Sequence, residues 1–93
     1  MHAVFVEVEM DEERAQHMQT ALQVLGTPRL RALGAVSYVA LAPRNGRAVA
    51  IAEFPSEAAA SKAASTMREG GQAGPNPMTR FRTVEVREVL VRL

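Results

Sequence analysis

The segments on either side of the dipeptide Asn45-Gly46 constrain this chain more than any other feature. Both residues tolerate positive φ, which a type I′ turn requires, so the two short apolar runs beside them, about 35–42 and 47–54, predict a β-hairpin. A strand-like and a helix-like segment precede this hairpin, and another helix-like and strand-like segment follow it. This order predicts an α+β fold in which one four-stranded antiparallel sheet carries two helices on one face.

Alternating residues over 2–10 predict the first strand, with Val4, Val6 and Val8 on one face and Phe5 on the other. An apolar stripe at helical spacing follows, in a helix that begins near Asp11.

Gly26 interrupts that stripe and leaves two interpretations open. Either Thr27 caps a second, short helix, with Pro28 in its first turn and Gly34 at its end, or the glycine kinks one continuous helix.

A second helix is predicted after Pro55, with Ser56 as its N-cap and Gly70-Gly71 as its end. Its buried stripe consists of Ala60, Ala63, Ala64 and Met67. Such small residues either let the helix approach the sheet closely or leave unfilled space beneath it.

The last strand is predicted over about 81–93 and changes parity within its length. Its valines are even-numbered up to Val86 and odd-numbered from Val89 onward. A β-bulge near Arg87-Glu88 explains this change, and so does burial of both faces.

Apolar residues occur on both faces of the predicted sheet, whereas the two helix stripes can cover only one. We assign the helix-covered face to Val4, Val6, Val8, Val49 and Ile51. The open face then carries Phe5, Tyr38 and Phe54. Exposing such residues leaves a patch larger than monomers usually tolerate, and the reverse assignment of faces leads to the same result. The pattern therefore predicts a homodimer through the open sheet face, with Glu7, Glu9, Arg82 and Arg87 as paired charges at its edges.

Composition excludes several classes of function. The 93 residues suit a single domain over 1–93, and the net charge of +1 argues against nucleic acid as a partner. The chain has no cysteine, which excludes disulfides, thiolate metal sites and a cysteine nucleophile. No apolar run has the length of a membrane span, so we expect no membrane partner and a cytoplasmic protein.

Three segments, VFVEVEMDEERAQHM, AVAIAEFPSEAAASKAA and TVEVREVLVRL, together with the βαββαβ order, resemble the dimeric α/β-barrel superfamily. Within it the chain is most similar to the antibiotic biosynthesis monooxygenase group. The resemblance implies a ferredoxin-like fold and a cofactor-independent monooxygenase-like activity on an aromatic or polyketide-like small molecule. Polyketide cyclases, lactone isomerases, haem-degrading enzymes and proteins without a known reaction share this architecture.

The chain departs from the active members of that group, which use pocket Trp, Asn and His or Arg residues. It has no Trp, and its two asparagines are Asn45, in the turn, and Asn76, in a predicted loop. No residue role can therefore be carried over from the group.

His17 and Tyr38 are the catalytic candidates. The imidazole of His17 titrates near neutrality and suits a general base, although a half-exposed surface histidine fits the same position. The phenol of Tyr38 can hydrogen-bond a ketone or quinol, or lie at the rim of the dimer interface instead.

Phe5, Met67, Asn76 and Arg80 are the predicted ligand-binding residues. Asn76 and Arg80 belong to a long loop that either closes over a pocket or is a plain connection. The two histidines lack metal-ligand spacing, so we expect neither a metal nor another cofactor.

Three hypotheses about function follow. The chain is a small enzyme for an aromatic or polyketide-like compound, a non-catalytic ligand-binding or accessory protein, or an interaction module without a cavity. A void between the sheet and the helices distinguishes the third from the others.

Overall fold

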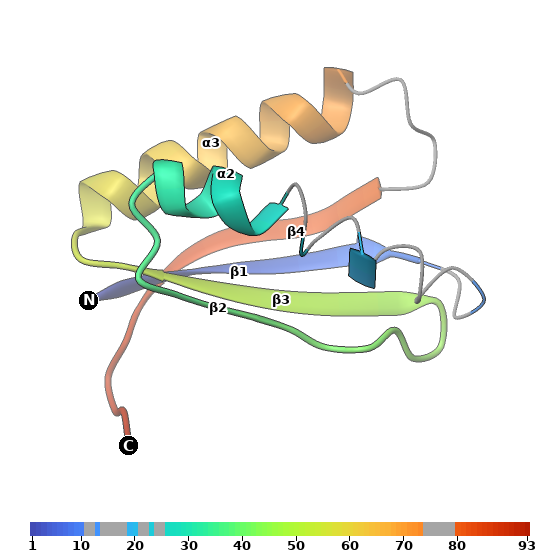
Figure 1. The fold of residues 1–93 in the computed structure, drawn as a ribbon, viewed down its shortest axis with the longest axis horizontal. Coiled ribbons are helices and arrows are strands. Elements are labelled where there is room, and N and C mark those ends of the chain that lie inside the picture. The colour runs from blue at the N-terminus through green and yellow to red at the C-terminus, as the bar shows by residue number, and fades with distance from the viewer. Residues whose placement is uncertain (11–12, 14–18, 21–22, 24–25, 74–79) are drawn as a thin grey trace.

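The computed structural model describes residues 1–10, 13, 19–20, 23, 26–73 and 80–93. Its elements are β1 (His2–Glu9), α2 (Thr27–Ala32), β2 (Ser37–Ala40), β3 (Arg47–Phe54), α3 (Glu57–Ala73) and β4 (Arg80–Glu88). The four strands form one antiparallel sheet in the order β2-β3-β1-β4. Figure 1 shows α2 and α3 on one side of this sheet, as predicted.

The hairpin between β2 and β3 has the predicted turn. Asn45 and Gly46 have φ angles of 55° and 74°, the positive values that a type I′ turn requires. The residues that flank the turn, Arg44 and Arg47, exchange two backbone hydrogen bonds of 2.8 and 3.1 Å. The pairing shifts by one residue between this turn and the regular part of the hairpin, where Tyr38 lies opposite Ala52.

The register corrects our assignment of faces on β2 and β3. Val4, Val6 and Val8 are buried beneath the helices, as assigned, but they pair with Ala52, Ala50 and Ala48. Residues that pair directly share a face, so Tyr38 and Phe54 lie on the helix-covered face, whereas Val49 and Ile51 lie on the open face with Phe5. The assignment of Val49 and Ile51 to the covered face, and of Tyr38 and Phe54 to the open face, is therefore wrong. The space beneath the helices is instead filled by the β1 valines and Phe54, which leaves room for alanines on β3.

The bulge in β4 lies elsewhere than predicted. Glu7 pairs with Thr83 and Val8 pairs with Phe81, so Arg82 is the extra residue, far from Arg87-Glu88. The strand also ends at Glu88 instead of continuing to residue 93. The parity change in the sequence therefore reflects the end of the strand and not a bulge there.

Arg82 pairs with the acidic side chains of β1, as predicted for this edge. Its guanidinium lies 4.0 Å from the carboxylate of Glu7 and 3.5 Å from that of Glu9. Both pairs are partly exposed, and exposed pairs contribute about 0–1 kcal/mol to stability.

α3 begins at the predicted cap, because the Ser56 hydroxyl accepts a hydrogen bond of 3.1 Å from the backbone N–H of Ala59. Ala60, Ala63 and Ala64 have no exposed surface, which confirms close approach of this helix to the sheet. The predicted end at Gly70-Gly71 is wrong, since the helix continues to Ala73. A helix-interior glycine costs only about 1 kcal/mol relative to alanine, so a continuing hydrogen-bond ladder can outweigh it.

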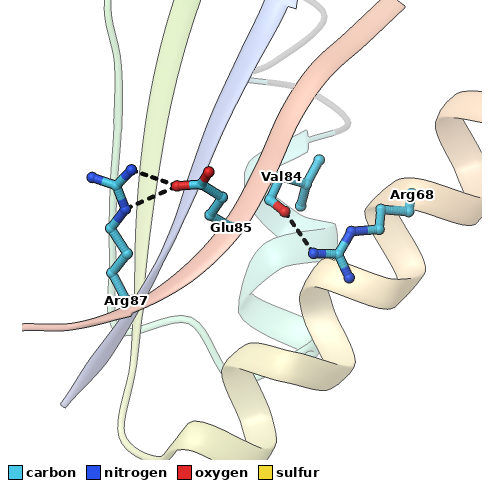
Figure 2. A network of polar contacts seen from close by, with 4 residues as sticks. All are labelled: Arg68, Val84, Glu85 and Arg87. Atoms are coloured by element: carbon cyan, nitrogen blue, oxygen red, sulfur yellow. Dashed lines mark hydrogen bonds and ion pairs between the residues drawn. The ribbon is translucent and has the colours of Figure 1, made fainter.

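α3 is also tied to the edge strand, as Figure 2 shows. The Arg68 guanidinium donates a hydrogen bond to the backbone carbonyl of Val84 in β4. In the same strand, Arg87 forms an ion pair with Glu85.

α2 is short and ends as predicted. Gly34 has a φ of 99°, and the N–H of Ala35 bonds to the carbonyl of Leu30 at 3.0 Å, which closes the helix. The prediction that Thr27 caps this helix is wrong. Thr27 is its first helical residue, and the residue before it, Gly26, also has helical backbone angles. The predicted start at Asp11, and the choice between a kink and two helices, lie outside the described residues. Within the described residues, no helix has the length and hydropathy to cross a membrane.

Candidate ligand-binding site

A cavity of about 530 Å³ lies between the sheet and the helical segment that precedes β2. Its walls come from β1, from the β2–β3 hairpin, from Phe81 of β4 and from Gln19, Gln23 and Thr27. The lining is mostly apolar. It includes Val6 and Val8 of β1, and Met10, which follows that strand. This cavity counts against the hypothesis of an interaction module without a void.

Small residues on the hairpin make room for this cavity. The alanines that line it are Ala40, Ala42, Ala48 and Ala50. Ala40 and Ala50 pair directly across the two strands, so their methyl groups share one part of the helix-covered face. A methyl group leaves open the volume that a larger side chain would occupy at each position.

Tyr38 brings a hydroxyl to this apolar lining. The residue is half-buried, packs against the core and faces the cavity from β2. Burial raises the pKa of the Tyr38 phenol above its ordinary value of 10.0, because the phenolate would be poorly solvated. At neutral pH the group is therefore a protonated phenol that can donate a hydrogen bond and cannot serve as a base.

Uncharged polar groups complete the lining. Gln19 and Gln23 lie four residues apart, a spacing that places both on the same side of a helix, and Thr27 follows them. Among the described residues that line the cavity, Tyr38 is the only one with an ionisable side chain. This lining suits a neutral molecule, because a charged one would lose its hydration without gaining a described counter-ion.

The other candidate residues in the described part of the chain lie apart from this lining. Phe5 is on the open face, where the guanidinium of Arg87 lies 5.2 Å from the centre of its ring. Met67 is in α3, half-buried against the core. His17, Asn76 and the side chain of Arg80 lie outside the described residues.

The residues that surround Tyr38 were not singled out from the sequence. Met10, Phe81, Gln19 and Gln23 line the cavity, but in the sequence they carry no pattern that marks a site. A usable signal was present, because alanines alternate along both strands of the hairpin on the side of the only tyrosine. Among the described residues, no group of three or more His, Cys, Asp or Glu side chains is placed to hold a metal ion.

Comparison with known proteins adds evidence on the fold. No family model matches the chain, and no curated protein matches it in sequence. The structure is similar to a dimeric ferredoxin-like protein from an uncultured marine organism, with a TM-score of 0.70 and 13% identity over 99% of this chain and 96% of that one.

Two further solved structures share this architecture. A single-residue mutant of MhuD, solved with two manganese protoporphyrin IX molecules per active site, has a TM-score of 0.72 and 13% identity over 100% of this chain and 98% of that one. HapK from Hahella chejuensis has a TM-score of 0.63 and 14% identity over 97% and 93%. These similarities confirm the predicted ferredoxin-like fold, and at these identities they establish the fold alone.

Proposed function

We propose that this chain binds a neutral, aromatic or polyketide-like small molecule in the cavity, with the Tyr38 hydroxyl as the donor that orients it. The observation that carries the proposal is a protonated phenol facing an apolar cavity of about 530 Å³. Pockets for small molecules commonly have volumes of roughly 300–1,000 Å³, apolar walls and a few polar groups. The cavity has each of these properties.

One similar structure supports a flat, aromatic ligand. MhuD, which has the same fold, was solved with manganese protoporphyrin IX, a flat aromatic molecule, in its active site. A flat ligand also suits a space bounded by a sheet on one side and a helical segment on the other. For the present chain we propose a smaller ligand that carries a carbonyl or phenolic oxygen for Tyr38.

Titration calorimetry with two matched compounds tests this function. 1-Tetralone is a neutral fused-ring ketone, and tetralin has the same rings without the carbonyl. We expect the ketone to bind more tightly by up to about ten-fold, since a neutral hydrogen bond contributes about 0.5–1.5 kcal/mol. In Tyr38→Phe this preference should disappear while the affinity for tetralin stays the same. If neither compound binds saturably, the proposal is overturned. If Tyr38→Phe still prefers the ketone to tetralin, Tyr38 is not the donor that orients the ligand.

An enzymatic function of the same site is the second candidate, and the protonated phenol favours it. A hydrogen bond from Tyr38 to a substrate carbonyl would stabilise an enolate, which suits cofactor-independent oxygenation or a cyclase or isomerase reaction. His17 would be the base. Dioxygen uptake and product mass, followed with aromatic ketones, distinguish the two candidates, because a compound recovered unchanged supports binding alone.

We also propose that two copies associate through the open sheet face. Val39 and Ile51 expose 56% and 39% of their surface there, which is costly for large apolar side chains. The similar marine proteins are described as dimeric, which supports the same arrangement here. Light scattering at micromolar concentration should give twice the mass of one chain, whereas the mass of one chain would rule out this dimer.

A further inference from the structure

The bulge in β4 decides on which face of the sheet Phe81 lies. Regular alternation without the bulge would place residue 81 on the same face as Thr83, which pairs with Glu7 of the open face. Because Arg82 is the extra residue, Phe81 pairs instead with Val8, a buried residue of the covered face. Bulges of this kind re-aim a side chain, and they are frequent beside active sites. Here the re-aimed side chain lines the cavity.

Arg82 and Phe81 are neighbours in the sequence but serve opposite faces. The Arg82 guanidinium lies 4.0 Å from the carboxylate of Glu7 and 3.5 Å from that of Glu9, and these two residues share the open face. Phe81 is half-buried and packs against the core. The ion pairs hold Arg82 away from the covered face, which leaves the position opposite Val8 to the phenyl ring.

Two aromatic side chains, Tyr38 and Phe81, belong to the described lining of the cavity. They come from β2 and β4, the two outer strands of the sheet. Neighbouring strands lie about 4.8 Å apart, so the backbones of these two strands are separated by roughly 14 Å. Along β1, Tyr38 is in register with Val4, whereas Phe81 is in register with Val8, one helix-covered turn of the pleat further on. The phenol and the phenyl ring therefore lie towards opposite ends of the cavity.

The two ends of the cavity differ in what they can distinguish. The Tyr38 hydroxyl donates a hydrogen bond, so its end separates a ketone from a hydrocarbon. Phe81 offers only a ring, and its neighbours in the lining, Val8 and Met10, are apolar. An aromatic ring that packs on another gains free energy beyond that of the buried area, which a saturated ring of the same size does not. The Phe81 end can therefore separate an aromatic ring from a saturated one.

We propose that Phe81 is the residue by which the site selects an aromatic ring, and that the ligand lies across the sheet from β2 to β4. Its oxygen meets the Tyr38 hydroxyl at one end, and its aromatic ring packs on Phe81 at the other. The inference rests on the proposed function of the cavity, to which it adds the orientation of the ligand and the residue that makes the site specific.

Calorimetry with 4-phenylcyclohexanone and 4-cyclohexylcyclohexanone tests the role of Phe81. Both compounds carry a ketone at one end, and they differ only in whether the ring at the other end is aromatic. The unmodified chain should prefer the phenyl compound, and Phe81→Leu should reduce this preference by roughly two- to ten-fold, the range expected for an aromatic pair. Val86→Ala is the matched control and should leave the preference unchanged. Val86 lies on the same strand and face, but it pairs with Val4, and neither residue lines the cavity.

Isotope-filtered NOE spectra of the unmodified chain give a result that does not depend on the folding of a variant. With carbon-13-labelled protein and unlabelled 4-phenylcyclohexanone, we expect NOEs from the phenyl protons of the ligand to the ring protons of Phe81. The protons beside the ketone should instead show NOEs to the ring protons of Tyr38. The reverse pattern would overturn the inference.

The failure of this inference can be distinguished from failure of the proposed function. If 1-tetralone binds and is preferred over tetralin, but Phe81→Leu keeps its full preference for the phenyl compound, Phe81 does not select the ring and the proposed function stands. Binding of 1-tetralone without binding of 4-phenylcyclohexanone would likewise overturn the orientation alone. If none of these compounds binds saturably, the proposed function is overturned, and this inference with it.

Discussion

The two faces of the sheet consist of the same strands, yet they differ in what covers them and in what they can bind. On the covered face, Val4 and Phe54 have no exposed surface, and the alanines of α3 pack directly above. On the open face, Phe5 and Ile51 lie among charged neighbours, and Ile51 remains 39% exposed. One face therefore supplies the core, and the other supplies a surface for association.

The covered face is itself divided. Where α3 lies over it, the small residues belong to the helix and the space is filled. Where Gln19, Gln23 and Thr27 face it, the small residues belong to the β2–β3 hairpin, and a cavity is left. Alanine thus produces close packing in one half and space for a ligand in the other.

The largest expected effect separates the two faces. Phe54→Ala removes a fully buried ring and should lower the free energy of unfolding by about 3–5 kcal/mol. Ile51 lies on the open face of the same strand and serves as the control. Ile51→Ala should lower the free energy of unfolding of the monomer by about 1 kcal/mol or less. Urea unfolding at low protein concentration measures both. Equal losses would mean that the two faces are equally buried.

The next effect separates the two halves of the covered face. Ala63→Leu forces a larger side chain into filled space beneath α3 and should destabilise the chain by about 1–3 kcal/mol. Ala50→Leu adds the same atoms beside the cavity, so we expect little loss of stability together with loss of 1-tetralone binding. Thermal unfolding and calorimetry provide the two measurements. If Ala50→Leu destabilises as much as Ala63→Leu, the cavity is absent.

A third difference depends on pH and concerns the cavity. Because burial raises the pKa of Tyr38 in the folded state, the neutral phenol contributes stability that is fully present below the unfolded pKa of about 10. This contribution is lost as the pH rises through the raised folded pKa. Tyr38→Phe cannot ionise, so its stability should fall less between about pH 8 and about pH 11. Parallel curves for the two proteins would place the phenol in solvent.

The smallest effect concerns the charges at the edge of the open face. Arg82→Gln removes both pairs with β1 and should cost about 0–1 kcal/mol, with a difference that shrinks at high salt. Lys62→Gln, at an exposed position in α3, is the matched control and should have no measurable effect. A large loss that does not depend on salt would show that Arg82 acts through packing.

The elements of the fold could be predicted because their signals are local. The turn at Asn45-Gly46, the cap at Ser56 and the alanine stripe of α3 each depend on neighbouring residues, and the structure confirms all three. The faces of β2 and β3 could not be predicted in this way. Alternation shows which residues share a face, but the pairing between strands decides which face meets the helices, and that pairing depends on the whole sheet.

The site was harder to predict for the same reason. Tyr38 was identified as a chemical residue, but its position in a cavity follows from its pairing with Ala52 and from helical residues that are distant in sequence. The cavity arises from what small side chains leave unfilled, and no single residue signals it. Side chains with obvious chemistry, such as Phe5 and Arg87, instead lie together on the open face.

Chemical-shift mapping with 1-tetralone tests most directly whether the two faces have different roles. Saturable shifts should occur at the cavity residues Val6, Tyr38 and Ala50, whereas Val39 and Ile51 on the open face should stay unchanged. Saturable shifts confined to the open face, or no saturable shift at any of these residues, would contradict a ligand site between the sheet and the helices.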